Sequence, residues 1–336
     1  MKKTIAIVAG GDSSEYVVSL SSAKGIYTFF DKEKYQVYVV KMVKGCWSVL
    51  LNFDEKLGAE NPNIKEIPVD KNDFSFALGN EVVTFDYAYI TIHGEPGEDG
   101  CLQGYFEMMN IPYSTCGVLA ASMTYNKFVC AQYLKCFGIT VAESLILKEK
   151  DVPSLDFDDV RNRIGYPCFV KPNLGGSSFG ITKVRCESEL LPAIKKAFGE
   201  DRDVIIEAFL DGVEVTCGCY CVQGEKVVLP ITEVVTHNEF FDYNAKYCGE
   251  VDEITPARIS DELTKAIQAK TMQIYDLLNC AGIIRIDYIV TKSEIINLLE
   301  VNTTPGMTST SFIPQQVAAA GLSMRQVLTE LVESAF

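Results

Sequence analysis

Apolar and polar positions alternate between strand-like and helix-like segments from residue 4 to about residue 117. A short apolar run such as residues 5–9 predicts a buried strand, and the longer segments between such runs predict helices. This alternation predicts a parallel, doubly wound sheet that binds ligands at the carboxyl ends of its strands. Gly10-Gly11 and His93-Gly94 fall at two such ends. The expected strands are 5–9, 35–41, 87–92 and 111–114, and the expected helices are 13–30 and 102–109.

The remainder of the chain has two differently patterned parts. A helix is expected at residues 119–137, closed by Gly138, and a small unit of strands and helices at 139–205. From residue 204 onward the strand-like runs are typical of an antiparallel sheet. The later elements are a helix at 260–279, a hairpin at 283–302 and a helix pair at 314–334.

Three oxygen-bearing side chains lie on the two strand-like runs of the expected hairpin: Asp287, Glu300 and Asn302. Side chains alternate faces along a strand, so Arg285 shares a face with Asp287, and Glu300 shares one with Asn302. If these faces coincide, two carboxylates and an amide converge beside a guanidinium, which suits Mg²⁺ that also holds phosphate. A solvated outer face is the alternative. The Gly/Pro loop at 303–308 favours the site, because such a loop brings backbone close to a ligand.

A second candidate site is the Gly/Ser-rich loop at residues 171–180, which lies between two expected strands. Its backbone N–H groups and hydroxyls can face phosphate, although it lacks the P-loop pattern and is also typical of a plain turn. Lys171, at the end of the preceding strand, supplies the cation that a phosphate loop needs. Glu207 ends the next strand, where it can meet an adenine, and Glu214 follows at a distance suited to a ribose hydroxyl.

The composition is that of a globular protein: 336 residues, 48% hydrophobic and 22% charged, enough for two or three compact domains. A net charge of −15 without any Lys/Arg run disfavours a nucleic-acid partner. The apolar start is too short for a signal peptide or a membrane span, so we expect a cytoplasmic protein without a membrane partner. Cys217, Cys219 and Cys221 would share one strand face and could bind metal, but buried reduced thiols are the favoured interpretation.

Six motifs follow one another along the chain, at residues 10–20, 93–104, 171–180, 243–247, 285–287 and 300–309. In this order they resemble the ATP-grasp ligases, and among them the D-alanine–D-alanine ligase family. The resemblance covers residues 3–336 and implies an α/β (α+β) ATP-grasp fold with an N-terminal doubly wound, pre-ATP-grasp domain that holds the first D-alanine. The implied domains are 1–117, a small central α/β domain at 118–206, and an antiparallel C-terminal domain at 207–336 with a lid at about 236–252.

The resemblance also implies the chemistry: ATP-dependent joining of two D-alanines through a D-alanyl phosphate, releasing ADP and phosphate, for peptidoglycan synthesis. It implies a homodimer and two Mg²⁺ or Mn²⁺ ions, held by Asp287, Glu300 and Asn302. The implied ATP-binding residues are Lys127, Lys171, Ser178, Glu207, Leu210, Glu214 and Lys246. The implied catalytic residues are Glu15, Ser177, Tyr247, Arg285, Gly306 and Ser311, and the implied substrate contacts are His93, Lys246 and Phe312.

Departures from the family pattern concern the second substrate and the lid, and they occur at Tyr16, Val17, Ala208, Asn244 and Phe312. The tyrosine at position 247 resembles the residue that dipeptide-forming relatives have there, rather than the residues of relatives that use D-lactate. A D-alanine–D-serine or D-alanine–D-lactate ligase therefore stays open as an alternative. A catalytically silent ATP-binding regulatory protein is a further alternative, but it has no need of the complete set of Arg285 and the three metal ligands.

Overall fold

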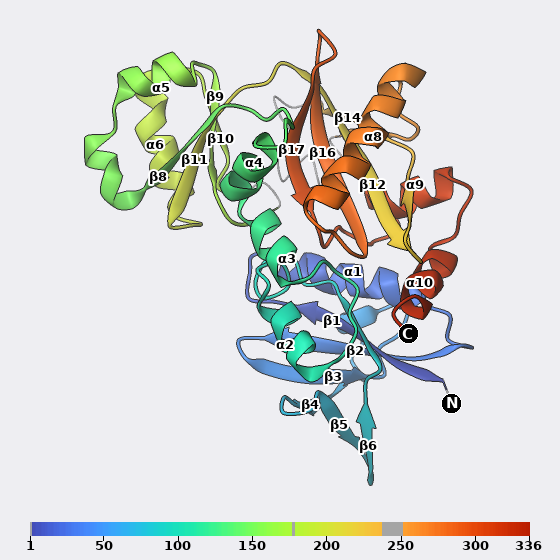
Figure 1. Cartoon of the computed structure of the whole chain (residues 1–336). Coiled ribbons are helices and arrows are strands. Elements are labelled where there is room, and N and C mark those ends of the chain that lie inside the picture. Colours follow the sequence, from blue (N-terminus) through green and yellow to red (C-terminus); the bar gives the residue numbers. More distant parts are fainter. Residues whose placement is uncertain (1, 177–178, 237–250) are drawn as a thin grey trace.

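The strands of this protein form three separate sheets, of seven, four and six strands. The computed structural model describes residues 2–176, 179–236 and 251–336 (Figure 1). The seven-stranded, N-terminal sheet lies below the other two in that view, and the four-stranded, central sheet stands beside the six-stranded, C-terminal one. The α/β class predicted from the sequence is confirmed.

In the N-terminal sheet only β1 (Lys3–Gly10), β2 (Tyr35–Val43) and β7 (Tyr87–Ile90) run parallel, in the order β2-β1-β7. The prediction of a wholly parallel sheet is wrong for the other four strands, which extend it antiparallel beyond β2. The cause is a tight turn at Lys44 and Gly45, both with positive φ, which folds the chain back as a hairpin. The added strands are β3 (Cys46–Leu51), β4 (Lys65–Asp70), β5 (Ser75–Leu78) and β6 (Glu81–Thr84), with a 3₁₀ turn η1 at Gly58–Glu60.

Helices cover both faces of this sheet, as its alternating side chains require. Helix α1 (Tyr16–Phe29) buries Ala23 and Ile26 against one face, in a core that also includes C-terminal helices α9 (Phe312–Ala319) and α10 (Met324–Glu333). Helix α2 (Cys101–Met109) packs on the other face. The N- and C-terminal parts of the chain therefore share one hydrophobic core.

The expected helix at residues 119–137 is broken into α3 (Val118–Tyr125) and α4 (Lys127–Lys135). Asn126 takes an extended conformation between them, and its side chain caps α4 by accepting a hydrogen bond from the Val129 N–H at 2.9 Å. Lys127 consequently stands at the first position of a new helix. Its backbone N–H donates to the carbonyl of Asn173 at 3.2 Å, which ties α4 to the Gly/Ser-rich loop.

The central sheet, in the order β10-β9-β11-β8, is antiparallel and has a core of its own with α5 and α6. Its strand β9 coincides with the predicted strand that carries Lys171. The elements are β8 (Ser144–Lys148), η2 (Glu149–Ser154), α5 (Phe157–Arg163), β9 (Cys168–Pro172), β10 (Thr182–Val184), α6 (Glu187–Ala197) and β11 (Asp203–Ala208).

The C-terminal sheet follows the order β15-β14-β12-β16-β17, with β13 paired to β12, and every pairing is antiparallel as predicted. Helix α8 (Asp261–Leu277) covers one face, where Cys217 and Cys219 are buried free thiols, in agreement with the favoured interpretation. Helices α3 and α4 also contact β17 and share this core. The strands are β12 (Gly212–Val222), β13 (Glu225–Val228), β14 (Thr232–Thr236), β15 (Val251–Ile254), β16 (Ile283–Thr291) and β17 (Ile296–Asn302).

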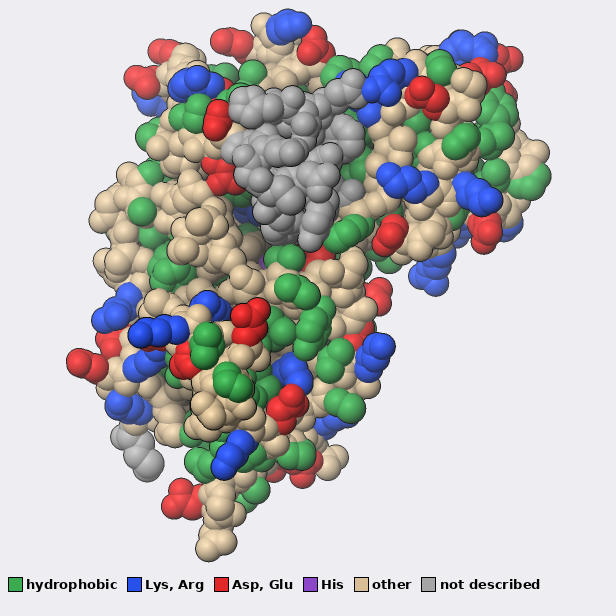
Figure 2. Space-filling model, turned by 180° about the vertical axis from the view of Figure 1, so that it is seen from behind, with side chains coloured by type: hydrophobic (Ala, Val, Ile, Leu, Met, Phe, Trp, Pro, Cys, Tyr) green, Lys and Arg blue, Asp and Glu red, His purple; other side chains and the backbone are tan. Residues whose placement is uncertain are grey.

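The surface seen in Figure 2 carries Lys and Arg side chains interspersed with Asp and Glu. Among the helices that the structure describes, none combines the length and the apolar character needed to cross a membrane.

Candidate active site

Two adjoining cavities lie where the three sheets meet, with volumes of about 760 and 630 Å³. The larger is bounded by the central and C-terminal sheets, and we call it the nucleotide cavity. The smaller is bounded by α1, the end of β17 and the start of α9, and we call it the amino-acid cavity. Both are lined by Lys127 and Glu300, which therefore stand at the boundary between them.

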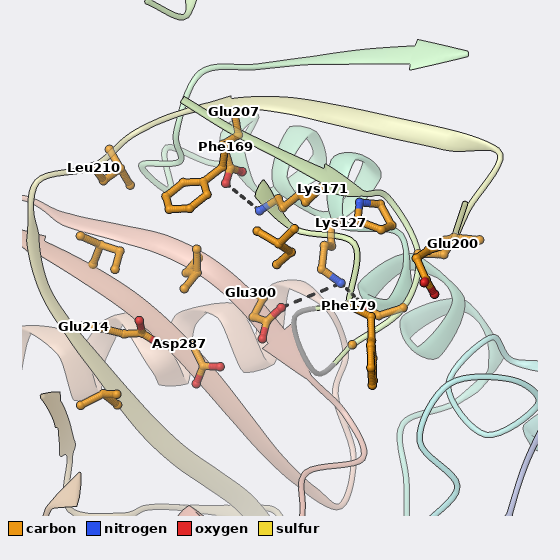
Figure 3. A pocket seen from close by; sticks show the side chains of 18 of the residues that line it. Lys127, Phe169, Lys171, Phe179, Glu200, Glu207, Leu210, Glu214, Asp287 and Glu300 are labelled. Atoms are coloured by element: carbon orange, nitrogen blue, oxygen red, sulfur yellow. Dashed lines mark hydrogen bonds and ion pairs between the residues drawn. The ribbon is translucent and has the colours of Figure 1, made fainter. Parts of the chain in front are cut away.

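The nucleotide cavity has an apolar end with one charged pair in it (Figure 3). Lys171 is buried on β9 and donates to the Glu207 carboxylate of the neighbouring strand at 2.6 Å. Cross-strand pairing opposes Glu207 to Phe169, so the carboxylate lies next to an aromatic side chain. A flat, apolar slot edged by a hydrogen-bond acceptor suits a nucleobase. The apolar lining includes Phe169, Phe179, Ile181, Leu210, Val213, Ile289 and Leu299.

Lys127 reaches from the start of α4 toward the middle of the nucleotide cavity (Figure 3). Its Nζ donates to the Gly175 carbonyl and lies 3.9 Å from the Glu300 carboxylate. Lys127 and Lys171 thus bring two cations to one cavity of an acidic protein, and the predicted Glu214 lines the same cavity. The sequence predicted Lys127, Lys171, Glu207 and Glu214 as parts of one site, and all four line this cavity.

The predicted hairpin is present, and its polar faces coincide: Asp287 pairs with Glu300, and Arg285 with Asn302. The register slips after Asp287, so that Leu299 is an extra residue in β17. Such a bulge turns neighbouring side chains toward one side. Leu299 and Glu300 both line the nucleotide cavity as a result.

Asp287 accepts hydrogen bonds from three side chains. Arg285 donates to both of its oxygens, at 2.9 and 2.8 Å, and the Thr216 hydroxyl donates to Oδ1 at 2.6 Å. The Asn302 amide donates to Oδ2 at 3.1 Å. Arg285 and Asp287 were predicted on one face, and here they form a direct bidentate pair.

The donor set of this hairpin fits a hard cation. Asp287, Glu300 and Asn302 offer oxygen ligands near Lys127 and Lys171, and oxygen ligands are the chemistry of Mg²⁺ or Mn²⁺ sites. The cluster holds two carboxylates and an amide, and in the described part of the chain no three His, Cys, Asp or Glu side chains are grouped for metal binding.

The amino-acid cavity gathers six of the residues predicted for catalysis or substrate contact: Glu15, His93, Arg285, Gly306, Ser311 and Phe312. His93 is buried at the end of the segment that follows β7, and the Ser22 hydroxyl lies 3.2 Å from its Nε2. Burial lowers the pKa of His93, which Glu15 opposes, so the ring is neutral near pH 7. The Arg285 guanidinium lies over the Phe312 ring, 5.2 Å from its centre.

Glu15 is buried just before α1, against the Gly/Ser-rich loop. A Cβ atom on Gly176 would lie 2.7 Å from its Oε2, so the loop backbone approaches the carboxylate as only glycine allows. Four predicted residues, Ser177, Ser178, Lys246 and Tyr247, lie outside the described residues, as does residue stretch 237–250 of the expected lid.

Ser311 is held at the start of α9 by its own loop. Its hydroxyl accepts from the Thr308 N–H at 3.0 Å and lies 2.7 Å from the Thr308 hydroxyl. A Cβ on Gly306 would meet the Ser311 hydroxyl at 3.1 Å, so the backbone of Gly306 and this hydroxyl face each other across a narrow gap. Backbone N–H and hydroxyl donors are therefore presented to one small region of the cavity.

Sequence reasoning missed Glu98, which also lines the amino-acid cavity. Its carboxylate accepts from the Gly94 N–H at 2.7 Å. Burial, with Glu15 nearby, raises the pKa of Glu98 to about 8. The sequence could have indicated Glu98 through its place in the motif at residues 93–104, but in that motif only His93 was assigned a role.

A nucleotide-sized cavity between two antiparallel sheets, with paired lysines and a carboxylate–amide cluster, defines the class of ATP-grasp enzymes. Two family models match this chain: "D-ala D-ala ligase N-terminus" over residues 4–116 and "D-ala D-ala ligase C-terminus" over residues 133–333. The chain belongs to the D-ala D-ala ligase family, and it is a ligase.

Relatives named D-alanine--D-alanine ligase match over the full length. The one from Bacteroides fragilis (strain YCH46) is 62% identical over 336 residues, which are all of both chains. The one from Porphyromonas gingivalis (strain W83) is 53% identical over 333 residues, 99% of this chain and 98% of that one.

Solved structures agree with the fold. The VanG D-Ala:D-Ser ligase from Enterococcus faecalis superimposes with a TM-score of 0.87 at 32% identity, covering all of both chains. A D-alanine--D-alanine ligase from Bacillus anthracis complexed with ATP gives a TM-score of 0.73 at 26% identity, covering 99% of this chain and 96% of that one.

Proposed function

We propose that this protein joins two molecules of D-alanine into D-alanyl-D-alanine for peptidoglycan synthesis, with conversion of ATP to ADP and phosphate. The observation that carries the proposal is the common wall of the two cavities. Lys127 and Glu300 line both, so a γ-phosphate in one cavity lies next to an amino acid in the other. Phosphoryl transfer depends mainly on such positioning and on charge stabilisation.

ATP would lie in the nucleotide cavity with its base at the apolar end. Glu207 and the backbone near Leu210 would hold adenine, and Glu214 the ribose. Lys127 and Lys171 would bind the phosphates as charge-assisted donors. We assign Ser178 and Lys246, from the segments that the structure leaves undescribed, to the same phosphates on the family resemblance.

The first D-alanine would lie in the amino-acid cavity, with its ammonium near Glu15 and beneath His93. Its carboxylate oxygen attacks the γ-phosphorus, the bond to the β-phosphate oxygen breaks, and ADP leaves behind a D-alanyl phosphate. The amine of the second D-alanine then attacks the acyl carbon, and phosphate departs. Arg285 and the Gly306 N–H would stabilise the oxyanion of that step.

The second D-alanine would be held by Ser311, which faces Gly306 across the cavity, and by the side of Phe312. Ser177 and Tyr247 would join Glu15 in closing the site, as the family resemblance implies. Closure matters because water would hydrolyse the acyl phosphate.

Asp287, Glu300 and Asn302 would hold two Mg²⁺ or Mn²⁺ ions. When bound, the ions neutralise the charge that develops on the β- and γ-phosphates. We expect Asp287→Ala and Glu300→Ala each to abolish turnover, measured as D-alanine-dependent phosphate release. Asp276→Ala, an exposed carboxylate paired with Lys226 on the far face of the sheet, is the matched control and should keep normal rates. Near-normal rates in both site variants would refute the metal assignment.

The overall activity is tested with the purified protein, ATP, Mg²⁺ and D-alanine. Phosphate should be released with D-alanine and not with L-alanine, because Glu15 at the ammonium, Arg285 and Gly306 at the carboxyl group, and His93 above the substrate would together fix the configuration at the α-carbon. Absence of D-alanine-dependent phosphate release contradicts the proposed function.

A D-alanine–D-serine ligase is a second candidate, favoured by one observation: Phe312, beside Arg285, shapes the pocket for the second substrate. Supplying D-alanine together with D-serine or D-lactate, and identifying the products by mass, decides between these acceptors. D-Alanyl-D-alanine as the main product supports the first candidate.

We further propose that the enzyme acts in the cytoplasm as a homodimer, and that its domains are residues 1–117, 118–206 and 207–336. These assignments rest on the family resemblance.

A further inference from the structure

Glu253 is a carboxylate of the amino-acid cavity that lies in none of the six sequence motifs. It lies on β15, the edge strand of the C-terminal sheet, and lines the cavity together with Arg285, Ser311 and Phe312. Cross-strand pairing places Glu253 opposite Val234, which in turn pairs with Glu214. Paired residues of adjacent strands project from the same face, so Glu253 projects from the face that carries the nucleotide-site residues.

A hydrogen bond from α9 fixes the Glu253 carboxylate. The Gln315 side-chain amide donates to Glu253 Oε2 and also to the Thr310 carbonyl, the latter at 2.7 Å. Gln315 belongs to the first turn of α9, whose N-cap is Ser311. The carboxylate is thus tied to the same turn that presents Ser311 and Phe312, the proposed contacts of the second amino acid.

The electrostatic surroundings of Glu253 suit a proton acceptor. The side chain is partly buried, and this burial raises its pKa, while the Gln315 hydrogen bond and the charge of Arg285 oppose the rise. From β16 the facing charge is Arg285, and from α9 the facing group is the neutral amide of Gln315. The other titratable residues that line the same cavity are Glu15, His93, Glu98, Lys127 and Glu300.

The second amino acid presents a chemical problem that the residues assigned so far leave unsolved. Near neutral pH its amine is an ammonium ion, which has no lone pair and cannot attack the acyl phosphate. A group within reach must accept a proton first, and a carboxylate in a partly dry pocket is suited to that task. Glu15 is assigned to the ammonium of the first amino acid.

We infer that Glu253 binds the ammonium of the acceptor amino acid and takes one proton from it. The freed lone pair forms the new C–N bond at the acyl carbon, the carbon–oxygen bond to phosphate breaks, and phosphate leaves with that electron pair. The second N–H proton passes to the departing phosphate as the tetrahedral adduct collapses to the amide, and Glu253 returns its proton to water after product release. This inference rests on the proposed ligase function.

Hydroxylamine separates this role from all earlier steps. It is a neutral nucleophile near pH 7, so it traps a D-alanyl phosphate as the hydroxamate without help from a base. With ATP, Mg²⁺ and D-alanine, Glu253→Gln should form D-alanyl hydroxamate at a rate within about twofold of wild type. Its D-alanyl-D-alanine formation should fall by about 10²-fold or more, the usual contribution of a general base. The retained hydroxamate reaction also shows that the variant is folded.

A pH profile supplies the second readout. Dipeptide formation by Glu253→Gln should rise steadily with pH, because free D-alanine then arrives already deprotonated, whereas wild type should be close to its plateau. Asp252→Asn changes the adjacent, exposed carboxylate of the same strand and should behave as wild type.

The outcomes are distinguishable. Equal loss of hydroxamate and dipeptide in Glu253→Gln, or a wild-type dipeptide rate, overturns the inference. Failure of the wild-type protein to form any hydroxamate counts instead against the proposed ligase function.

Discussion

The charged residues of the site are paired with one another. Arg285 holds Asp287, Lys171 holds Glu207, and Lys127 lies near Glu300. Buried charges cost several kcal/mol unless they are paired, so these contacts stabilise the site. In the proposed reaction, phosphate would become a partner of the two lysines, and Asp287 and Glu300 would hold the metal.

Glu98 should make the stability of the protein depend on pH. Its pKa is about 8 in the fold, raised from 4.5, so between these values the folded state binds more protons than the unfolded state. The free energy of unfolding therefore falls as pH rises from about 5 to 8, by at most about 1.4 kcal/mol per pH unit for one group. Glu98→Gln resembles the protonated form and lacks this contribution.

Urea unfolding at about pH 6 and pH 8 checks the role of Glu98. The free energy of unfolding of Glu98→Gln minus that of wild type should be larger at pH 8 than at pH 6. Glu107→Gln, an exposed carboxylate on α2, serves as the control and should leave the difference between the two pH values unchanged. A constant difference between Glu98→Gln and wild type would show that Glu98 titrates normally.

At the scale of elements, the break between α3 and α4 positions Lys127. Asn126→Ala removes the cap of α4 and should lower the free energy of unfolding by about 1 kcal/mol. Because Lys127 is the first residue of α4, the KM for ATP should rise as well. The matched control is Ser260→Ala, which removes the cap of α8, where the hydroxyl accepts from Leu263 N–H at 3.1 Å. It should cost similar stability without changing that KM.

Helix α1 contacts the loop that contains Gly306 and Met307. This contact should reverse the stabilisation that a Gly-to-Ala substitution usually gives in a helix. Gly-to-Ala in a helix interior normally stabilises by about 1 kcal/mol. A Cβ on Gly25, however, would lie 2.2 Å from the Met307 carbonyl oxygen, so Gly25→Ala should destabilise the protein and lower dipeptide formation. Gly104→Ala in α2 is the control, since its Cβ would approach only Val118 at 3.8 Å. Thermal unfolding that shows stabilisation in both variants would contradict this reading of the contact.

The elements that the sequence predicted well are those with continuous apolar runs, such as β1, β9 and β16. The strands between residues 46 and 84 were not assigned, because they are short and mixed in exposure; β6 is largely exposed. The helix break at Asn126 also escaped prediction, since Asn is tolerated inside helices and acts here as a cap. The hairpin and the pairing of Asp287 with Glu300 were predictable, because side chains alternate faces along a strand. The places of Glu98 and Glu253 in the cavity were not predicted. Segments far away in the sequence bury these two side chains, and the residues next to them in the sequence do not indicate that burial.

At the scale of the molecule, the N- and C-terminal sheets share a core, whereas the central sheet has a separate one. Gly25 against Met307, and Gly282 against Ser114, mark backbone contacts between the first two parts that leave no room for a side chain. The central sheet is connected to the rest chiefly around the nucleotide cavity and through α4. We therefore expect the central unit and the remainder of the protein to be the two bodies that close on ATP.

This division predicts how the nucleotide affects unfolding. Without ligand, the central unit lacks a core in common with the rest and should unfold first in calorimetry, as a separate low-temperature transition. ADP with Mg²⁺ contacts both bodies, so at about 100 times its Kd it should add about 2.7 kcal/mol and merge the transitions. Lys171→Ala removes a phosphate contact on the central side and should weaken the shift, whereas Lys226→Ala, far from the cavity, should not. A single ligand-free transition that ADP moves as a whole would mean that the central unit is already coupled to the rest, and closure on ATP would then need another explanation.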